Sequence, residues 1–593
     1  MRRRLDAAMR VDLGVLLALV VVGLLIGVAV VRLPSVVGAY LDDGIYLVTG
    51  RAVATGHGYR HLELPGEPLQ TKYPPLYPLL LSVVWRVFPD FPANVPAFQI
   101  LNVALWTLGA WLAYRLMQRA WGIPWWLATA GSVLAFGNAM TLTVLRTAFS
   151  EPLFLVVSMG ALHSAAGPAT NAATPPRREL ARSILGGLLA AATYLTRSIG
   201  LAMIPALLVD AVVRRRWKML VVATVIAAAG AGGWHAWRKA ATATNARSVP
   251  VEALRYDLDY SAWLPADART LGRVVGHNVA ALSLSVFEEV VQPPAGVVDR
   301  LLRSGPRAAL PVYIGMGLLA ALLLLGMTVT FRRSAPAAHL YLVGYAGLVL
   351  MWPYPPTRLL TPILPLGLTL VLAGLAEVIR RAAVLLSGPE PAGVASTPNV
   401  PPTLRQAWRP GAVGVGAAFR VTAGCVLLLA YARVQPLLRP YEAQLQERHA
   451  LAEAQQQRAA LVTLLREETP PHAIVSARYG GYLYLCTERK TVPVVPGDNP
   501  IPMTYPADRP WWGCGRVITP QMLDADRRFA EERLGEHLNA TGATHVVPVE
   551  NRETYYWQAF QRLRLRNPGV LRRIGGTGPY ELYAIDGPLR PAL

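Results

Sequence analysis

Cysteine and charged residues are scarce in this sequence of 593 residues, in which three are cysteine and 16% are charged, against 53% that are hydrophobic. Three cysteines exclude a disulfide-rich scaffold. So little charge beside so much apolar side chain also excludes an ordinary soluble protein of this length. Two of the cysteines, Cys486 and Cys514, fall in the C-terminal region, where they can form a disulfide if that region faces an oxidising compartment.

Acidic residues are few as well, since 36 aspartates and glutamates stand against 57 lysines and arginines. The resulting net charge of +21 would suit nucleic-acid binding in a soluble protein. Here, however, the basic residues gather in short loops between apolar runs, which is typical of the cytoplasmic loops of membrane proteins. We therefore expect membrane lipids as partners and no nucleic acid.

Long apolar runs account for the hydrophobic excess. The first, residues 13–31, contains no charge and is long enough to cross a hydrocarbon core. It follows three arginines at positions 2–4, and no small-x-small cleavage site comes after it, so we interpret it as an uncleaved first span with its N-terminus inside. Further runs bring the expected number of spans to about eleven: 97–116, 125–145, 152–162, 184–195, 199–213, 220–237, 308–330, 339–351, 359–378 and 413–429.

The arginine clusters between these runs set the orientation of the spans. With the spans given above, every dense cluster falls on the cytoplasmic side. The run 76–87 decides whether the number of spans is odd or even. If it were counted as a span, the later arginine clusters would fall outside the cytoplasm. It is short for a full crossing, so we interpret it as re-entrant or interfacial. The odd number of spans then places the C-terminal region outside the cytoplasm.

This topology divides the chain into two domains, the first of which contains a linker. Residues 1–432 form a polytopic α-helical membrane domain, with a first outer loop at 34–75 and an outer segment at 238–307. A Pro/Ser/Gly-rich stretch at 382–410 is the expected cytoplasmic linker. Residues 433–593 form the expected extracytoplasmic domain.

The C-terminal region alternates predicted helices and strands, which is typical of a small α/β domain. Its apolar and polar patterns predict helices at 441–465 and 522–538, and strands at 473–477, 482–486, 491–495, 545–549 and 581–585.

The first outer loop holds the most informative residues. Asp42 and Asp43 lie just beyond the first span, where carboxylates close to hydrocarbon are costly and usually functional. The alternative is a pair of solvated aspartates that cap a helix. Lys72 lies at the start of the short apolar run, at the depth of a phosphate headgroup, although it also suits a snorkelling lysine.

These residues stand in two motifs, Asp42-Asp43-Gly44-Ile45-Tyr46 and Lys72-Tyr73-Pro74-Pro75-Leu76. They resemble the motifs Asp-acidic-x-x-Tyr and Lys-x-Pro-Pro-Leu that open and close the first outer loop of GT-C glycosyltransferases, the aminoarabinose transferases and protein O-mannosyltransferases above all. The segments 150–154 and 358–362 resemble later parts of the same family. Thr71 stands where the aminoarabinose group often has an acidic residue, which argues against that sugar.

The resemblance implies a GT-C fold and an inverting transfer of sugar from polyprenyl phosphate. Such a reaction needs a carboxylate that takes a proton from the acceptor hydroxyl and cations that stabilise the departing phosphate. With the topology, it gives three groups of candidate residues, all at the outer face. Asp42 and Asp43 are the catalytic candidates, and either can be the base; Lys72, Arg197 and Arg358 are candidates for phosphate binding; Tyr46, Tyr73, Arg146 and Glu151 are candidates for the substrate pocket.

The resemblance names no certain cofactor and leaves a divalent cation open. By their residue types alone, His57, His61 and Glu63 are potential ligands of such an ion. No Gly-x-x-x-x-Gly-Lys or dinucleotide motif is present, which favours a lipid-linked sugar over a nucleotide sugar.

We therefore expect a glycosyltransferase at the outer face of a bacterial plasma membrane, acting on a glycan, lipid or protein acceptor. The alternative is a transporter or lipid flippase with a periplasmic domain. It would place charges or broken helices near the bilayer midplane and often shows two repeated halves.

Overall fold

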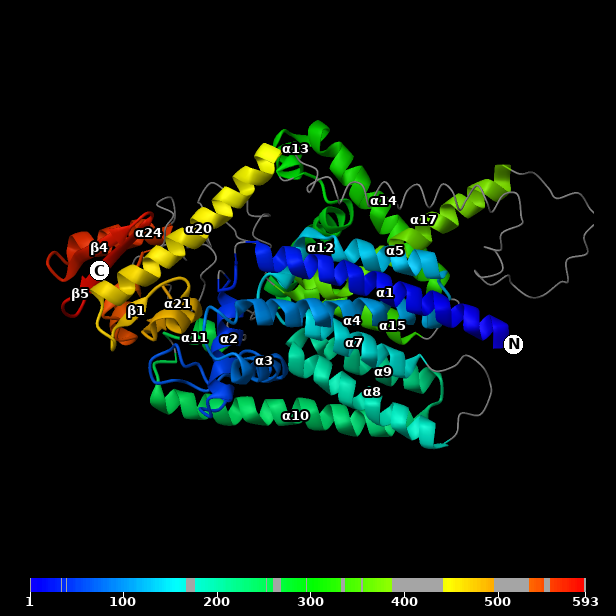
Figure 1. Cartoon of the computed structure of the whole chain (residues 1–593), viewed down its shortest axis with the longest axis horizontal. Coiled ribbons are helices and arrows are strands. Elements are labelled where there is room, and N and C mark those ends of the chain that lie inside the picture. The colour runs from blue at the N-terminus through cyan, green and yellow to red at the C-terminus, as the bar shows by residue number, and fades with distance from the viewer. Residues whose placement is uncertain are drawn as a thin grey trace, which may run out of the picture.

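The protein is described by a computed structural model in which a helical bundle carries a smaller domain with a β-sheet at one end (Figure 1). It covers residues 2–33, 35–38, 40–166, 176–251, 253–259, 268–294, 296–331, 336–352, 356–386, 441–494, 533–548 and 555–590.

The first half of the bundle runs from the N-terminus to a long tenth helix. Its helices are α1 (Arg2–Arg32), α2 (Leu41–Ala54), α3 (Leu76–Val87), α4 (Val95–Trp121), α5 (Trp125–Phe136), α6 (Ala139–Leu145), α7 (Glu151–Ala165), α8 (Pro176–Thr196), η1 (Ser198–Ala202), α9 (Met203–Val213) and α10 (Trp217–Ser248).

The second half of the bundle begins with the short helix α11. Its helices are α11 (Arg255–Leu258), α12 (Ala268–Val291), α13 (Val297–Arg303), α14 (Pro306–Phe331), α15 (Ala337–Met351), α16 (Thr357–Leu360), η3 (Thr361–Ile363) and α17 (Leu364–Leu386).

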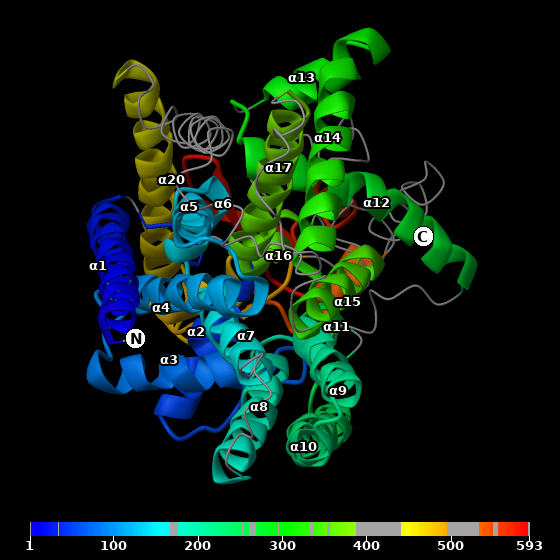
Figure 2. The ribbon, with the colours of Figure 1, turned by 90° about the vertical axis from the view of Figure 1, so that its right-hand side faces the viewer.

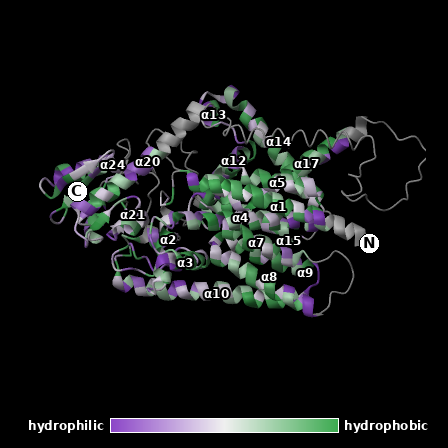
Figure 3. Ribbon diagram, viewed as in Figure 1, coloured by the Kyte–Doolittle hydropathy of each residue, from purple (hydrophilic) through white to green (hydrophobic). Residues whose placement is uncertain are grey.

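Hydrophobic residues predominate along the helices of this bundle (Figure 3), and they are found both exposed on its outside and buried in its interior. On α1, Leu24 and Leu25 are exposed, and on α14 so are Leu318 and Leu324, as lipid-facing residues are. Aromatic side chains such as Trp106 fill the interior, where packing between helices excludes lipid. A bundle with hydrophobic residues both on its surface and in its interior is typical of a multi-pass membrane protein.

Six helices among the described residues are long and apolar enough to cross a membrane, or seven if the bent pair α5–α6 forms one span. Four of the six contain expected spans and belong to α1, α4, α10 and α14, and a fifth belongs to the continuous stretch α16–α17. The expected runs 199–213 and 339–351 form shorter apolar helices, and the run 413–429 lies outside the described residues. The number of about eleven spans therefore stays a prediction.

The sixth helix, Val274–Val291 within α12, falls in the expected outer segment. This helix is long and apolar enough to cross a membrane, but its direction differs from that of the other bundle helices. The long α10 runs along the horizontal axis of Figure 1, whereas α12 is seen nearly end-on there and lengthwise in Figure 2. A helix that crosses the direction of the bundle in this way suits the membrane interface.

Within its described residues, the C-terminal region forms a mixed five-stranded sheet with the strand order β2-β1-β3-β5-β4. Strand β1 pairs in parallel with β2 and β3, and β5 pairs antiparallel with β3 and β4. The elements are α20 (Tyr441–Glu468), β1 (Ile474–Ser476), α21 (Gly480–Thr487), β2 (Lys490–Val492), β3 (His545–Val546), α24 (Tyr555–Arg566), β4 (Leu571–Thr577) and β5 (Tyr580–Ile585).

Most predicted elements of this region are confirmed, and one is wrong. The helix at 441–465 and the strands at 473–477, 491–495, 545–549 and 581–585 have their counterparts in α20, β1, β2, β3 and β5. Residues 482–486 were expected to be a strand but belong to the helix α21. The alternation of tyrosine and leucine there also suits a short buried helix, because a run of this length does not distinguish the two periods. Of the helix expected at 522–538, only residues from 533 onward are described.

Glycines let the bundle helices α14 and α17 approach each other closely. A Cβ atom at Gly326 would lie 2.0 Å from the carbonyl oxygen of Leu370, and one at Gly374 would lie 2.0 Å from that of Leu322. Small residues are what allow helix backbones to meet in a membrane, where packing replaces the hydrophobic effect.

We expect Gly326→Ala to lower the thermal stability of the purified protein in detergent, because the added methyl group overpacks this contact, at a cost of about 1–3 kcal/mol. Gly317→Ala is the matched control, since it lies on the same helix and a Cβ atom there meets nothing within 4 Å. Equal melting temperatures for the two variants would contradict the close approach of α14 and α17.

Candidate active site

The two aspartates of the first motif lie in the first turn of α2, directly after the chain leaves the first long helix. The free backbone N–H groups at a helix N-terminus favour negative charge, so this position stabilises both carboxylates. Glu151 has the same place in α7. Three carboxylates of the candidate site therefore stand at helix N-termini.

Asp42 is bound by residues from two distant parts of the chain. The hydroxyl of Tyr73 donates a hydrogen bond of 2.5 Å to one carboxylate oxygen, and Arg358, in α16, forms an ion pair with the other. Burial raises the pKa of Asp42, but the positive charges of Arg358 and Lys72 and the hydrogen bond from Tyr73 outweigh it and lower this pKa to about 2. Its side chain remains 21% exposed, so a substrate can reach it.

Glu151 is completely buried and shares two arginines. Its Oε1 atom lies 2.6 Å from Nη1 of Arg197, which follows α8, and 3.1 Å from Nε of Arg358. Arg358 therefore joins Glu151 to Asp42, and Arg197 also donates to the hydroxyl of Ser150 over 3.1 Å. These ion pairs connect α2, α7, α8 and α16 at one end of the bundle.

Asp43, the next residue, is also completely buried. Its two carboxylate oxygens accept hydrogen bonds from the backbone N–H groups of Gly38 (2.7 Å) and Gly44 (2.9 Å). Burial raises the pKa of Asp43 to about 7; the two backbone hydrogen bonds oppose this rise, and the negative charge of Asp42 adds to it. Asp43 thus fixes the backbone on either side of Asp42 but offers no accessible oxygen.

Lys72 is buried beside Asp42 at the end of the first outer loop. Its backbone N–H donates to the side chain of Gln70, and its Nζ atom lies 5.2 Å from the centre of the Tyr73 ring. Burial lowers the pKa of Lys72, whereas the negative charges of Asp257 and Asp42 raise it. The ammonium group is therefore held in a cluster of charges that includes both Asp42 and a residue from the outer segment.

That residue is Asp257 in α11, which is not among the residues expected from the sequence. It is buried, and its pKa is raised by burial to about 6 while the charge of Lys72 opposes this rise. Thr71, the neighbour of Lys72, donates a hydrogen bond of 2.6 Å to the carbonyl of Leu258 and so holds the outer segment against the loop. No motif marks Asp257, and only the fold brings it to Lys72.

Aromatic rings surround the cluster. The ring of Tyr46 lies 4.9 Å from that of Tyr73 and 5.3 Å from that of Tyr77, and its hydroxyl accepts a hydrogen bond of 3.3 Å from Ser150. The guanidinium of Arg358 lies 4.5 Å from the ring centre of Phe149. These contacts fix the orientations of the charged groups.

Arg146, the remaining candidate, follows α6 near this cluster. Burial and Asp43 raise the pKa of Tyr40, and the charges of Arg146 and Arg358 oppose that rise, which places both arginines close to this phenol. The fold therefore gathers all nine candidate residues at one end of the bundle.

The histidines do not complete a metal site within the described residues. His61 and Glu63 form a buried pair at 2.8 Å, but no group of three His, Cys, Asp or Glu side chains that could hold a metal ion occurs in the described part of the chain. Of the two candidate disulfide cysteines, Cys486 lies in α21 and Cys514 lies outside the described residues.

The C-terminal domain touches the backbone that carries the aspartates. A Cβ atom at Gly481, in α21, would lie 2.7 Å from the carbonyl carbon of Gly44, and one at Gly38 would lie 2.5 Å from Cβ of Tyr482. Arg51 pairs with Glu488 over 2.8 Å at the other end of α2. The turn that holds Asp43 is therefore enclosed between the bundle and α21.

Solved structures share this fold, although no family model and no curated protein matches the sequence. ArnT from Cupriavidus metallidurans bound to undecaprenyl phosphate has 13% sequence identity and a TM-score of 0.51, over 98% of this chain and 99% of that one. The same protein in the apo state has 15% identity and a TM-score of 0.50 over the same shares. The apo oligosaccharyltransferase from Archaeoglobus fulgidus has 14% identity and a TM-score of 0.50, over 92% of this chain and 70% of that one.

The structural similarity to ArnT extends over nearly the whole length of both chains and defines the fold class of this protein. It is a polytopic membrane protein with the GT-C fold, as the two motifs of the first outer loop predict.

The raised pKa of Asp43 predicts a pH dependence of stability. Its folded pKa of about 7 lies above the ordinary aspartate value, so the folded protein binds a proton that the unfolded chain releases. This contribution to stability is complete below about pH 4 and is lost as the pH rises through 7, on the order of a few kcal/mol.

We therefore expect the melting temperature of the wild type to fall between pH 5 and pH 8 relative to that of Asp43→Asn. Asp90→Asn, which removes an exposed carboxylate, is the control and should follow the wild type. Parallel curves for the wild type and Asp43→Asn would show that Asp43 is ionised throughout this range.

Proposed function

We propose that this protein is an inverting membrane glycosyltransferase that moves a sugar from polyprenyl phosphate to an acceptor hydroxyl at the outer face of a bacterial plasma membrane. The observation that carries the proposal is the convergence of Asp42, Lys72 and Arg358 at one end of the bundle. The base and the cations that the reaction needs thus lie within one charge network. The GT-C fold supports the proposal, since ArnT with this fold has been solved with undecaprenyl phosphate bound.

Lys72 and Arg358 are the proposed ligands of the donor phosphate. Both charges act on Asp42, so both cations lie beside its carboxylate. A phosphate bound there accepts hydrogen bonds from both, and its negative charge replaces that of Asp42 as their partner. Arg197 and Arg358 share Glu151, and this carboxylate holds both guanidinium groups in place.

Asp42 is the proposed base, because its carboxylate is partly exposed whereas that of Asp43 is sealed by two backbone N–H groups. In the free protein the pKa of Asp42 is held at about 2 largely by positive charges, which makes it a weak base. A phosphate that draws Arg358 and Lys72 toward itself removes part of this stabilisation and raises the pKa of Asp42. Binding of the donor thereby prepares the base.

The reaction then proceeds in one displacement. The acceptor oxygen attacks the anomeric carbon from the face opposite to the phosphate, and its proton passes to the carboxylate of Asp42. The bond between the anomeric carbon and the phosphate oxygen breaks, and its electron pair remains on the lipid phosphate. Lys72 and Arg358 stabilise the charge that develops on that oxygen.

We expect Asp42→Asn to abolish transfer, with a loss of at least about 100-fold as for a positioned base, while binding of polyprenyl phosphate is retained. The assay measures the release of polyprenyl phosphate from a panel of synthetic polyprenyl-phosphate sugars. Asp12→Asn is the matched control, because Asp12 pairs with Arg115 in another part of the bundle. Full activity of Asp42→Asn would remove Asp42 as the base.

We expect Lys72→Ala to raise the apparent KM for the donor by about tenfold, which corresponds to the loss of one charge-assisted hydrogen bond. Arg358→Lys should do the same and still compensate the buried Glu151. Arg51→Ala, which removes a cation that pairs with Glu488, is the control and should leave KM unchanged. Unchanged KM values in both site variants would place the donor phosphate elsewhere.

A further inference from the structure

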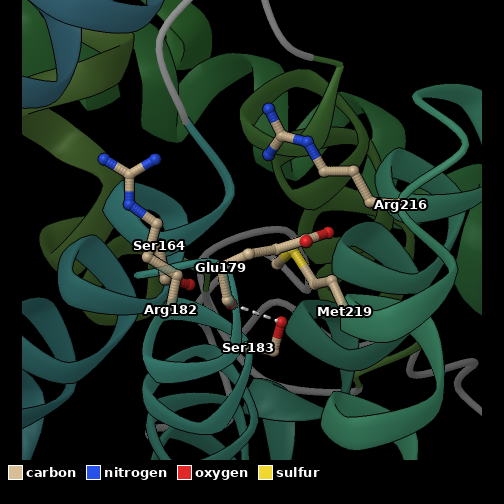
Figure 4. A pocket seen from close by; sticks show the side chains of 6 residues that line it. All are labelled: Ser164, Glu179, Arg182, Ser183, Arg216 and Met219. Atoms are coloured by element: carbon tan, nitrogen blue, oxygen red, sulfur yellow. Dashed lines mark hydrogen bonds between the residues drawn. The ribbon is translucent and has the colours of Figure 1, made fainter. Parts of the chain in front are cut away.

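A basic cavity of about 210 Å³ lies between α7, α8 and α10, at the end of the bundle opposite to the candidate active site (Figures 1 and 4). It is lined by Ser164, Glu179, Arg182, Ser183, Arg216 and Met219. The helix α8 connects the two ends of the bundle. Arg182 lies about 20 Å along this helix from its last residue, Thr196, at a rise of 1.5 Å per residue. Arg197, a residue of the candidate active site, comes directly after Thr196. The cavity is therefore separate from the ion pairs of the active site.

Two arginines give the cavity its charge. Arg182 and Arg216 come from different helix ends and reach along its two sides (Figure 4). Nη1 of Arg216 donates a hydrogen bond of 2.6 Å to the carbonyl of Ala165, which anchors this side chain. Burial lowers the pKa of Arg216, and the charges of Arg214 and Arg182 lower it further, although Asp210 and Glu179 oppose them. Glu179 offsets only part of the repulsion between these cations, and a further anion between them would relieve the rest.

The negative charge at the cavity is smaller than the positive charge. Glu179 is its acidic lining residue and lies 3.8 Å from Nζ of Lys218. Arg177, Arg178 and Arg215 are exposed near the same helix ends. By the positive-inside rule, this end of the bundle faces the cytoplasm.

Lipid-facing residues continue from the cavity into the membrane. On α8, Leu185 and Leu188 are exposed one to two turns beyond Arg182, and on α10 so are Val221 and Val225 beyond Arg216. Trp217, which follows Arg216, is exposed too, as is common for tryptophan at a membrane interface. A headgroup in the cavity would thus have apolar surface beside it for its acyl chains, which a free phosphate would not use.

We propose that this cavity binds the phosphate headgroup of an anionic phospholipid from the cytoplasmic leaflet. Arg182 and Arg216 hold the phosphate, and the exposed apolar faces of α8 and α10 contact the acyl chains. Basic pockets between helices at the cytoplasmic surface suit this kind of ligand.

The test counts lipids bound to the full-length protein by native mass spectrometry in a neutral detergent. The probes are phosphatidylglycerol, phosphatidylcholine and inorganic phosphate. We expect the wild type to retain phosphatidylglycerol, Arg182→Glu to bind it about tenfold more weakly, and Glu179→Gln to bind it more tightly. Arg178→Glu changes the charge equally on the same helix outside the cavity, and should weaken binding less than twofold.

Three results would overturn the proposal. An equal loss in Arg182→Glu and Arg178→Glu would show attraction by the basic surface in general. Equal retention of phosphatidylcholine would show no role for the headgroup charge, and displacement of phosphatidylglycerol by equimolar inorganic phosphate would identify a site for the free ion. Melting temperatures check that each variant is folded, and Arg182→Gln replaces Arg182→Glu if the reversal of charge unfolds the protein.

Discussion

The carboxylate of Glu151 has no contact with water, and it is stable there only because two guanidinium groups share it. A buried charge without a partner costs several kcal/mol, so Arg197 and Arg358 have to stay close to Glu151. Arg197 comes from the end of α8 and Arg358 from the start of α16, which fixes the relative positions of these helices and α7. Because Arg358 also pairs with Asp42, the same constraint places α2. The candidate active site is thus the point at which the ends of the bundle helices are held together.

The C-terminal domain also contacts the residues around the candidate active site. Gly481 lets α21 approach the backbone of Gly44, next to the two aspartates, and Lys490 donates to the carbonyl of Leu62 over 2.6 Å in the first outer loop. On the other side, Leu254 and Leu258 of the outer segment are buried in the same apolar cluster as Val546 of the sheet. The loop with Lys72 is therefore packed between the bundle, the outer segment and the domain. In this setting burial lowers the pKa of Lys72, and the negative charges of Asp257 and Asp42 oppose that effect.

The sequence allowed the central residues to be predicted because each stands in a motif. Asp42 and Lys72 belong to the two motifs of the first outer loop, and Glu151 and Arg358 to weaker ones. The charges at the ends of helices also fit a transferase better than a transporter, whose ionised groups belong near the midplane. Asp257 could not be predicted, since its approach to Lys72 depends on how a distant outer segment folds back. Likewise, the helix α21 was taken for a strand because a short run of alternating tyrosine and leucine suits both, and its close contact with Gly44 exists only in the folded protein.

The most direct test of this account is a structure of the full-length protein in lipid nanodiscs with undecaprenyl phosphate. If Lys72 and Arg358 bind the donor, phosphate density lies within hydrogen-bonding distance of both, and the ion pair between Arg358 and Asp42 is lengthened. Density for the phosphate only at Arg182 and Arg216, at the opposite end of the bundle, would contradict this prediction.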